Sequence, residues 1–191
     1  MISYYRNEIL SIAGVGAVQV YPAWQGGGTV LCSIISPDYT PVDPSMVENV
    51  QNIICPSPAG PTTPSSLGFG FAPIGAAVTI KTAESVTINI AATIETDASA
   101  SGDVSDYESE ITANIKAYID SVNAGWGNML KGFSIQYPVT IYIARIIASI
   151  ITVSGIINVS NVTINGSATD LQLTETAQLQ QVALLGEVTI S

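Results

Sequence analysis

Five carboxylates between residues 97 and 110 form the densest group of side chains that could bind a metal ion. They are Asp97, Asp103, Asp106, Glu108 and Glu110. Calcium prefers oxygen ligands, but an EF-hand loop places its ligands at alternate residues, and the spacing here differs. Acidic side chains also stabilise the start of a helix through its dipole. We therefore interpret this group as a helix start rather than as a metal site.

Other arrangements that could carry out catalysis are missing from the sequence. The absence of histidine excludes Ser-His-Asp and Cys-His triads and every zinc site that needs imidazole. Asp38 and Asp43 flank turn prolines, and nothing indicates the desolvation that a catalytic carboxyl pair requires. The glycine-rich segments 14–16, 26–28 and 68–70 do not continue into a phosphate-binding motif. We predict that the chain is not an enzyme and binds no cofactor or metal.

The composition argues against two kinds of partner. The net charge is -10, and the five Lys and Arg residues are scattered, whereas a nucleic-acid binder clusters them. The mean hydropathy is +0.41, but no apolar stretch reaches the ~18 residues that a membrane-spanning helix needs. The most apolar window, residues 139–151, contains Arg145. No signal peptide is readable at the N-terminus. We expect neither nucleic-acid binding nor membrane insertion.

Low charge and the cysteines give two further expectations. Only 10% of the 191 residues are charged, against about a quarter in an average domain. We infer that neighbouring subunits cover much of the surface. Cys32 and Cys55 are too few for a disulfide framework, so we predict unpaired thiols, with Cys32 buried in an apolar run.

Hydrophobic periodicity predicts the elements of a first module, residues 1–96. Apolar residues at helical spacing predict a helix over 2–12, and alternation predicts strands over 17–22 and 29–35. Asp43-Pro44 predicts the start of a second helix. A long loop over 56–73 follows, and strands are expected over 74–80 and 86–94.

A second module, residues 97–191, is expected after a polar hinge at 97–103, with Ser99, Ser101 and Gly102 as the hinge residues. Ser105 and Glu108 predict a capping box for the next helix. We further expect a strand over 133–137, a helix that begins at Pro138 and is buried on several sides, strands over 156–164, 169–173 and 182–190, and a tight turn at Asn165-Gly166.

The two modules share a short pattern. Ile9-Leu10, Ile12, Gly14-Val15 and Val18 are matched by Ile150-Ile151, Val153, Gly155-Ile156 and Val159. In both places a helix is expected to pass through a glycine break into a strand. The fold class that we predict is α+β, with two small modules, each with helices packed on a mostly antiparallel sheet.

Aromatic and glycine residues in turns mark a candidate interface. It consists of Tyr21, Trp24, Gly26, Gly27, Gly28, Phe69 and Phe71. Aromatic side chains are enriched in the centres of protein interfaces. The alternative is an adhesin-like module that binds glycans through the tip around Trp24 and the hairpin at 158–167, which contains three glycosylation-type sequons. An enzyme with an acidic metal site is the third hypothesis.

The order and spacing of several short motifs resemble the baseplate J-like family of contractile phage tails. The motifs are EILSIAGVGAVQVYP (residues 8–22), GGGTV (26–30), PVDP (41–44), APIGAAVTI (72–80), VSGIINV (153–159) and NG (165–166).

This resemblance implies a structural, non-catalytic wedge protein of a phage or related injection machine. Such a subunit would pair with copies of itself and with other wedge and hub proteins around the central hub, assembled in the bacterial host cytoplasm. It would take part in the rearrangement that triggers sheath contraction. Members of the family usually carry an additional N-terminal region, whereas Met1 precedes the first matching helix here. The resemblance therefore implies that this chain lacks that region.

Overall fold

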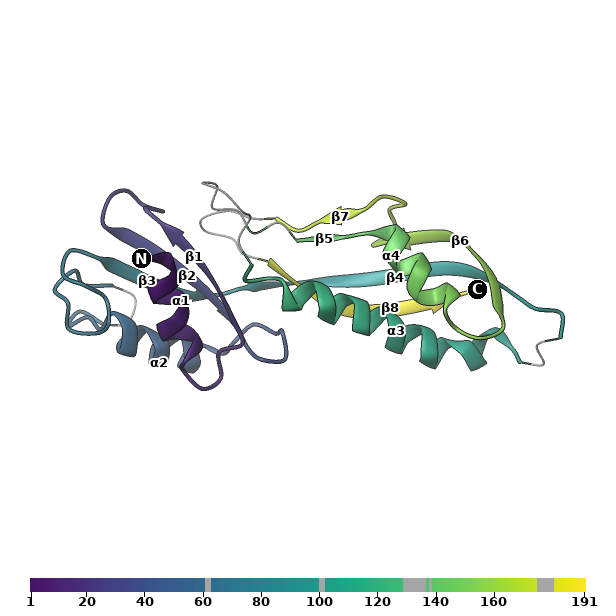
Figure 1. Ribbon diagram of the computed structural model, residues 1–191, viewed down its shortest axis with the longest axis horizontal. Coiled ribbons are helices and arrows are strands. Elements are labelled where there is room, and N and C mark those ends of the chain that lie inside the picture. Colours follow the sequence, from purple (N-terminus) through teal and green to yellow (C-terminus); the bar gives the residue numbers. More distant parts are fainter. Residues whose placement is uncertain (61–62, 100–101, 129–136, 138, 175–180) are drawn as a thin grey trace. The chain divides into compact units, whose positions relative to one another are not determined.

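The computed structural model describes residues 1–60, 63–99, 102–128, 137, 139–174 and 181–191 (Figure 1). Within them, the helices are α1 (Ile2–Leu10), α2 (Pro44–Ile54), α3 (Val104–Ala124) and α4 (Ile143–Ile151). The strands are β1 (Ala17–Pro22), β2 (Thr29–Ile35), β3 (Ala77–Thr82), β4 (Glu84–Thr96), β5 (Thr140–Ile141), β6 (Ile156–Ile164), β7 (Leu171–Gln172) and β8 (Gln181–Ile190). The predicted α+β class is confirmed.

The chain divides into two compact units whose segments interleave along the sequence. Unit 1 contains Met1–Ser85, Trp126–Pro138 and Thr174–Val182, and unit 2 contains Val86–Gly125, Val139–Leu173 and Ala183–Ser191. This division differs from the expected modules 1–96 and 97–191. The reason is that β4 is the central strand of the sheet β6-β4-β8, so most of β4 belongs with elements that follow it in the sequence.

The predicted hinge does not link these units. Residues 97–103 connect β4 to α3, and both flanking segments belong to unit 2. Ser99 donates from its backbone N–H and its hydroxyl to the Asp97 carboxylate, each at 3.0 Å, and these bonds lower the pKa of Asp97. A β-carbon on Gly102 would lie 2.8 Å from a carboxylate oxygen of Asp106. Ser101 lies outside the described residues.

Unit 1 contains a three-stranded sheet of order β1-β2-β3. β1 and β2 are antiparallel, but β2 and β3 are parallel, so this sheet is mixed rather than mostly antiparallel. α1 and α2 bury one apolar stripe each in a core shared with alternate residues of all three strands. The core includes both cysteine thiols, which are unpaired as predicted. Burial raises the pKa of the Cys32 thiol.

The start of α2 is the one predicted. Asp43 is the N-cap residue, Pro44 occupies the first turn, and the Asp43 carboxylate accepts hydrogen bonds from Met46 N–H at 2.8 Å and from the Ser45 hydroxyl at 2.6 Å. The Ser45 and Met46 hydrogen bonds lower the pKa of this carboxyl from 3.8. The ionised form is therefore favoured in the folded state.

We predict that Asp43→Ala lowers the melting temperature at pH 7 and that this difference disappears in acid. A carboxyl whose folded pKa is depressed stabilises the protein above its unfolded pKa, and this contribution is lost as the pH falls through the folded value. The measurement is thermal unfolding at pH 7 and well below the ordinary value of 3.8. Asp43→Asn is the control because it keeps an acceptor oxygen without the charge. An equal difference at both pH values would contradict the prediction.

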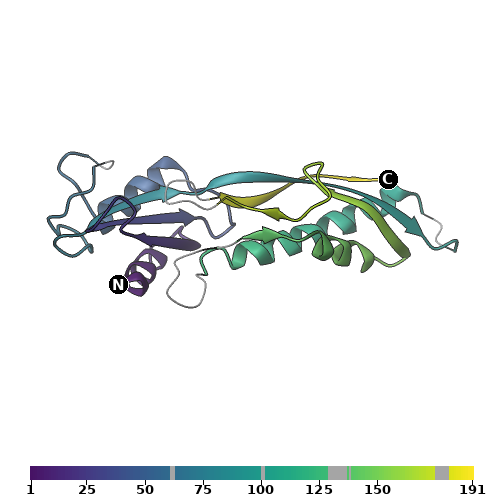
Figure 2. The same ribbon diagram turned by 90° about the horizontal axis from the view of Figure 1, so that it is seen from above.

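Unit 2 is built on the sheet β6-β4-β8, with α3 and α4 on one face of it (Figure 2). The buried side of α3 presents Ile111, Ile115, Tyr118, Ile119 and Asn123. β6 pairs antiparallel with β4, and the Asn165 amide continues this pairing: its oxygen accepts from Asn89 N–H at 2.8 Å and its nitrogen donates to Thr87 C=O at 3.0 Å.

Three local predictions for unit 2 are corrected. α3 begins at Val104, one residue before the predicted cap, and Asp106 rather than Glu108 accepts the hydrogen bond from Asp103 N–H. α4 begins at Ile143 instead of Pro138, because Thr140 and Ile141 pair with β7. α4 buries only Ile146 and Ile150.

The hairpin at the end of β6 is partly as expected. Asn165 and Gly166 adopt positive φ values of 50° and 79°, typical of a two-residue turn. The returning strand β7 nevertheless pairs with β5 and not with β6. The predicted strand over 133–137 lies outside the described residues except for Tyr137, which is in no strand.

The shared sequence pattern produces the same local turn twice. Ser11 after α1 and Thr152 after α4 both have φ -74° and ψ -14°, and Gly14 and Gly155 both have φ 94°. Glycine adopts this left-handed conformation without a steric penalty. The strands that follow pair differently, since β1 joins the next strand, β2, whereas β6 joins the preceding β4. The repeat is therefore one of local geometry and not of topology.

Candidate assembly surface

Tyr21 and Trp24, predicted at the interface, lie mainly inside unit 1. Tyr21 is only 7% exposed, and its ring contacts that of Tyr137 at 5.2 Å between centroids. Trp24 is half-buried against this cluster, with the Lys81 ammonium 5.0 Å from its ring centre. The prediction that Tyr21 lies at an interface is wrong, because Tyr137 covers the face of β1 that carries it.

The glycine turn lies beside the long loop of unit 1. Gly26, Gly27 and Gly28 are exposed. Gly28 C=O accepts a hydrogen bond from Ala77 N–H at 2.8 Å, and a β-carbon on Gly28 would lie 2.9 Å from Gly75 O. The structure therefore brings this turn next to the end of the loop that contains Phe69 and Phe71.

Phe69 and Phe71 are exposed, as an interface requires, and two further apolar residues of the same loop join them. The exposed fractions are 61% for Leu67, 69% for Phe69, 51% for Phe71 and 85% for Ile74. We call these four residues the apolar loop. Leu67 was not among the predicted interface residues, and Ile74 was predicted in a strand, but β3 begins only at Ala77. The available signal was a run of large apolar residues separated by Gly and Pro.

The backbone of the apolar loop is fixed on the end of α2. Ala72 N–H donates to Ile54 C=O at 2.7 Å, and Phe71 N–H donates to Ile53 C=O at 3.3 Å. The Tyr4 hydroxyl donates to Phe71 C=O at 2.8 Å. Ala72 is buried, whereas Phe71 and Ile74 of the same loop are exposed. Because these hydrogen bonds already fix the backbone of the loop, less conformational entropy is lost when its exposed apolar side chains bind a partner.

This surface suits contact with another protein. No charged residue occurs between Glu48 and Lys81 in the sequence. Exposed apolar side chains gathered in one place typically mark a protein interaction site. We therefore identify the apolar loop, with the adjoining turn at Gly26–Gly28, as the candidate assembly surface.

Gly70 lies close against the C-terminal end of α2. A β-carbon there would lie 2.7 Å from both Ile53 O and Ile54 O and 2.5 Å from Pro56 Cδ. We predict that Gly70→Ala displaces the loop and destabilises the protein by about 1–3 kcal/mol, the usual cost of overpacking. Urea unfolding measures the change. Gly27→Ala is the matched control, because nothing lies within 4 Å of a β-carbon at Gly27. Equal stability of the two variants would contradict the prediction.

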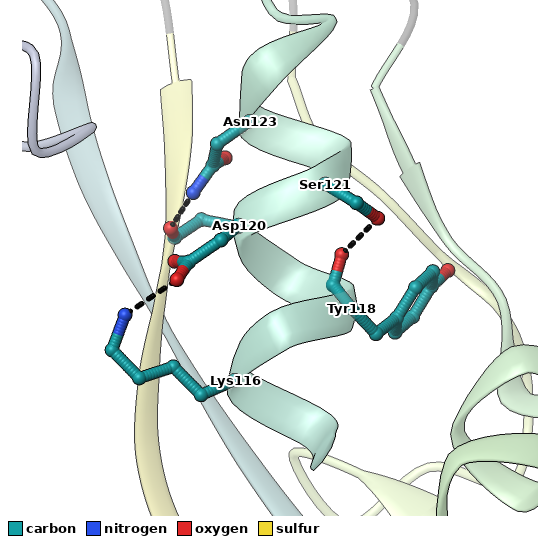
Figure 3. A network of polar contacts seen from close by, with 6 residues as sticks. Lys116, Tyr118, Asp120, Ser121 and Asn123 are labelled. Atoms are coloured by element: carbon teal, nitrogen blue, oxygen red, sulfur yellow. Dashed lines mark hydrogen bonds and ion pairs between the residues drawn. The ribbon is translucent and has the colours of Figure 1, made fainter. Parts of the chain in front are cut away.

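Polar contacts along α3 are structural. Figure 3 shows Lys116 paired with Asp120 at 2.6 Å, the Ser121 hydroxyl donating to Tyr118 C=O, and the buried Asn123 amide directed at the neighbouring strand. Asn123 donates to Ala183 C=O at 2.7 Å and so fastens α3 to β8. Exposed ion pairs such as Lys116–Asp120 contribute little to stability.

The described part of the chain contains no group of three or more Cys, Asp or Glu side chains arranged to hold a metal ion. In the same residues, no helix combines the length and the apolar character needed to cross a membrane. For the glycan-binding alternative, Tyr21 is buried and the Asn165 amide is engaged by β4.

The segment that forms most of unit 1 is similar in sequence to a domain of phage baseplate proteins. Residues 3–82 match the family model described as the baseplate J-like central domain. This match confirms the resemblance predicted from the sequence motifs. It contains α1, β1, β2, α2, the apolar loop and β3.

Two relatives from Bacillus subtilis (strain 168) extend the similarity to nearly the whole chain. The phage-like element PBSX protein XkdT is 26% identical over 187 residues, which is 98% of this chain and 47% of XkdT. The uncharacterized protein YqbT is 27% identical over 188 residues, again 98% of this chain and 47% of the relative. The chain thus spans about half the length of the curated relatives it matches. Together the matches support a structural protein of a phage baseplate.

Proposed function

We propose that the chain is a structural subunit of the wedge in a contractile-tail baseplate and has no catalytic role. It assembles around the central hub with other wedge and hub proteins, and with copies of itself, in the host cytoplasm. It takes part in the rearrangement that triggers sheath contraction. The observation that carries this proposal is the coincidence of the baseplate J-like match over residues 3–82 with an exposed, uncharged apolar loop inside the same segment.

The apolar loop can provide a substantial part of one subunit contact. Full burial of a large apolar side chain contributes about 1.5–3 kcal/mol. Four such side chains approach the cost of association, which is about 4–15 kcal/mol in lost freedom of motion. The loop therefore acts together with other surfaces, as expected in a ring where each subunit has several neighbours.

The low charge of the chain supports the same proposal. Interface centres are depleted in charged residues. Only Lys81 and Glu84 carry charge between Asn49 and Ile94. An adhesin-like role in glycan binding is favoured less, because only Trp24 of the proposed aromatic tip retains a partly exposed ring.

Mass spectrometry of contractile particles purified from cells that express this chain tests the proposal. The expected result is the peptides of this chain at a stoichiometry matching other baseplate proteins, with chemical cross-links to them. Sheath protein, present in many more copies, serves as the internal reference. Intact particles without this chain, or with only trace amounts, would overturn the proposal.

A further inference from the structure

One edge of the sheet in unit 1 is closed by side chains and by a close backbone approach. On β1, the backbone groups of Val18, Val20 and Pro22 point away from β2. The Tyr137 hydroxyl accepts from Val20 N–H at 2.8 Å and donates to Val20 C=O at 3.0 Å. A β-carbon on Gly127 would lie 3.0 Å from Val18 O, so this segment covers Val18. Pro22 has no N–H to offer.

The other edge, β3, is closed over only part of its length. Ala77 N–H donates to Gly28 C=O on the β2 side, so odd-numbered residues of β3 direct their backbone groups to β2 and even-numbered residues direct theirs outward. The buried Gln51 amide fills the first outward position. It donates to Val78 C=O and accepts from Ile80 N–H, each at 2.8 Å. A side-chain amide thus occupies the place of a neighbouring strand.

The next outward pair is open. Ile80 C=O and Thr82 N–H point away from β2 by the same alternation, and neither has a hydrogen-bond partner among the described residues. A groove of about 640 Å³ runs beside them, between β3 and the start of α2. Its lining includes the apolar residues Val42, Val47 and Ile80 and the charged residues Glu48 and Lys81. Backbone groups and apolar side pockets are what an added strand requires.

The positive charge of Lys81 indicates which residues an added strand would carry. Lys81 lies over the Trp24 ring and forms no ion pair with any described residue. A residue of an added strand that lies beside Lys81 would be favoured if it were acidic, since opposite charges stabilise cross-strand pairs. Its neighbours in that strand point to the other face, toward Val47 and Ile80, and would be apolar.

We propose that the outer edge of β3 at Ile80–Thr82 binds an extended peptide segment of a partner protein as an additional strand, with an acidic residue between apolar ones. The segment accepts from Thr82 N–H, donates to Ile80 C=O and places an apolar side chain in the groove. This site is separate from the apolar loop and goes beyond the proposed function.

The test is a titration of the full chain, labelled with nitrogen-15 and followed by NMR. The probe is a capped peptide that alternates valine and threonine and has one central aspartate. We expect saturable shifts centred on the amides of residues 80–82. The same peptide N-methylated at alternate residues, which cannot pair as a strand, is the control. No saturable shift at millimolar peptide, equal binding of the N-methylated peptide, or shifts centred on the apolar loop would each overturn the proposal.

A charge exchange tests the partner chemistry. Lys81→Glu is expected to weaken binding of the aspartate peptide about two- to fivefold, as for an exposed cross-strand pair. A peptide with lysine in place of aspartate should regain that affinity with Lys81→Glu. If the variant binds both peptides as the native chain does, the assignment of an acidic residue beside Lys81 is wrong.

Discussion

Replacement of Phe69 and Ile74 together by aspartate is expected to reduce incorporation into baseplates at least a hundredfold without a comparable loss of stability. These side chains are 69% and 85% exposed, so the fold loses little contact with them. In an assembled contact, each would forfeit about 1.5 kcal/mol or more of apolar burial. A total of about 3 kcal/mol corresponds to slightly more than a hundredfold in affinity. The new carboxylates would add a desolvation cost.

The measurement is competitive incorporation. The variant and the native chain are expressed together with distinct isotope labels, and their ratio in purified particles is compared with their ratio in the cell. Asn7→Asp with Asn49→Asp is the matched control, because both asparagines are exposed and the variant adds the same charge away from the loop. Equal incorporation of the loop variant would show that the apolar loop is not an assembly contact, even if the native chain is in the particle.

Removal of the Gln51 side chain is expected to be the most destabilising single change at a polar residue of unit 1. Gln51 is 2% exposed, and its amide bonds Cys55 C=O, Val78 C=O and Ile80 N–H. Gln51→Ala would leave the two groups of β3 without partners, at about 1–3 kcal/mol for each buried group. Because water can reach this edge from the groove, we expect a total loss of about 2–4 kcal/mol.

Urea unfolding measures this loss, and hydrogen exchange at the Ile80 amide reports the same hydrogen bond directly. Asn49→Ala is the control on the exposed side of α2 and should change stability by no more than about 0.5 kcal/mol. Gln51→Glu keeps an acceptor for Ile80 N–H and should leave that amide more protected than Gln51→Ala does. Equal stability of Gln51→Ala and Asn49→Ala would contradict the role assigned to this side chain.

The sequence predicted correctly those helix starts and turns that depend only on neighbouring residues. Asp43-Pro44 at the start of α2 and Asn165-Gly166 at the end of β6 depend on residues within one turn. The start of α4 was missed because a continuous apolar run fits a helix or a buried strand equally well. Thr140 and Ile141 form a strand because they pair with β7, where Thr140 lies opposite Gln172. The periodicity of the sequence does not reveal that contact.

The site was predictable only in part for the same reason. Phe69 and Phe71 stand out as aromatic residues in a loop, and they are exposed. Tyr21 has an equally suggestive position, but Tyr137 covers its face of the sheet from 116 residues away. Gln51 gave no signal, because a polar residue beside an apolar stripe usually faces solvent. Only the fold shows that its amide meets the backbone of β3.

The partly closed edges of the sheet in unit 1 affect how readily the protein aggregates before it meets its neighbours. An open strand edge is a template for aggregation, and many proteins protect such edges with charged side chains. The strands β1, β2 and β3 carry a single charged side chain, that of Lys81. The Tyr137 hydroxyl and the Gln51 amide act instead as uncharged gatekeepers. They occupy the edge backbone at Val20, Val78 C=O and Ile80 N–H, which confines the addition of another strand to the pair Ile80 C=O and Thr82 N–H.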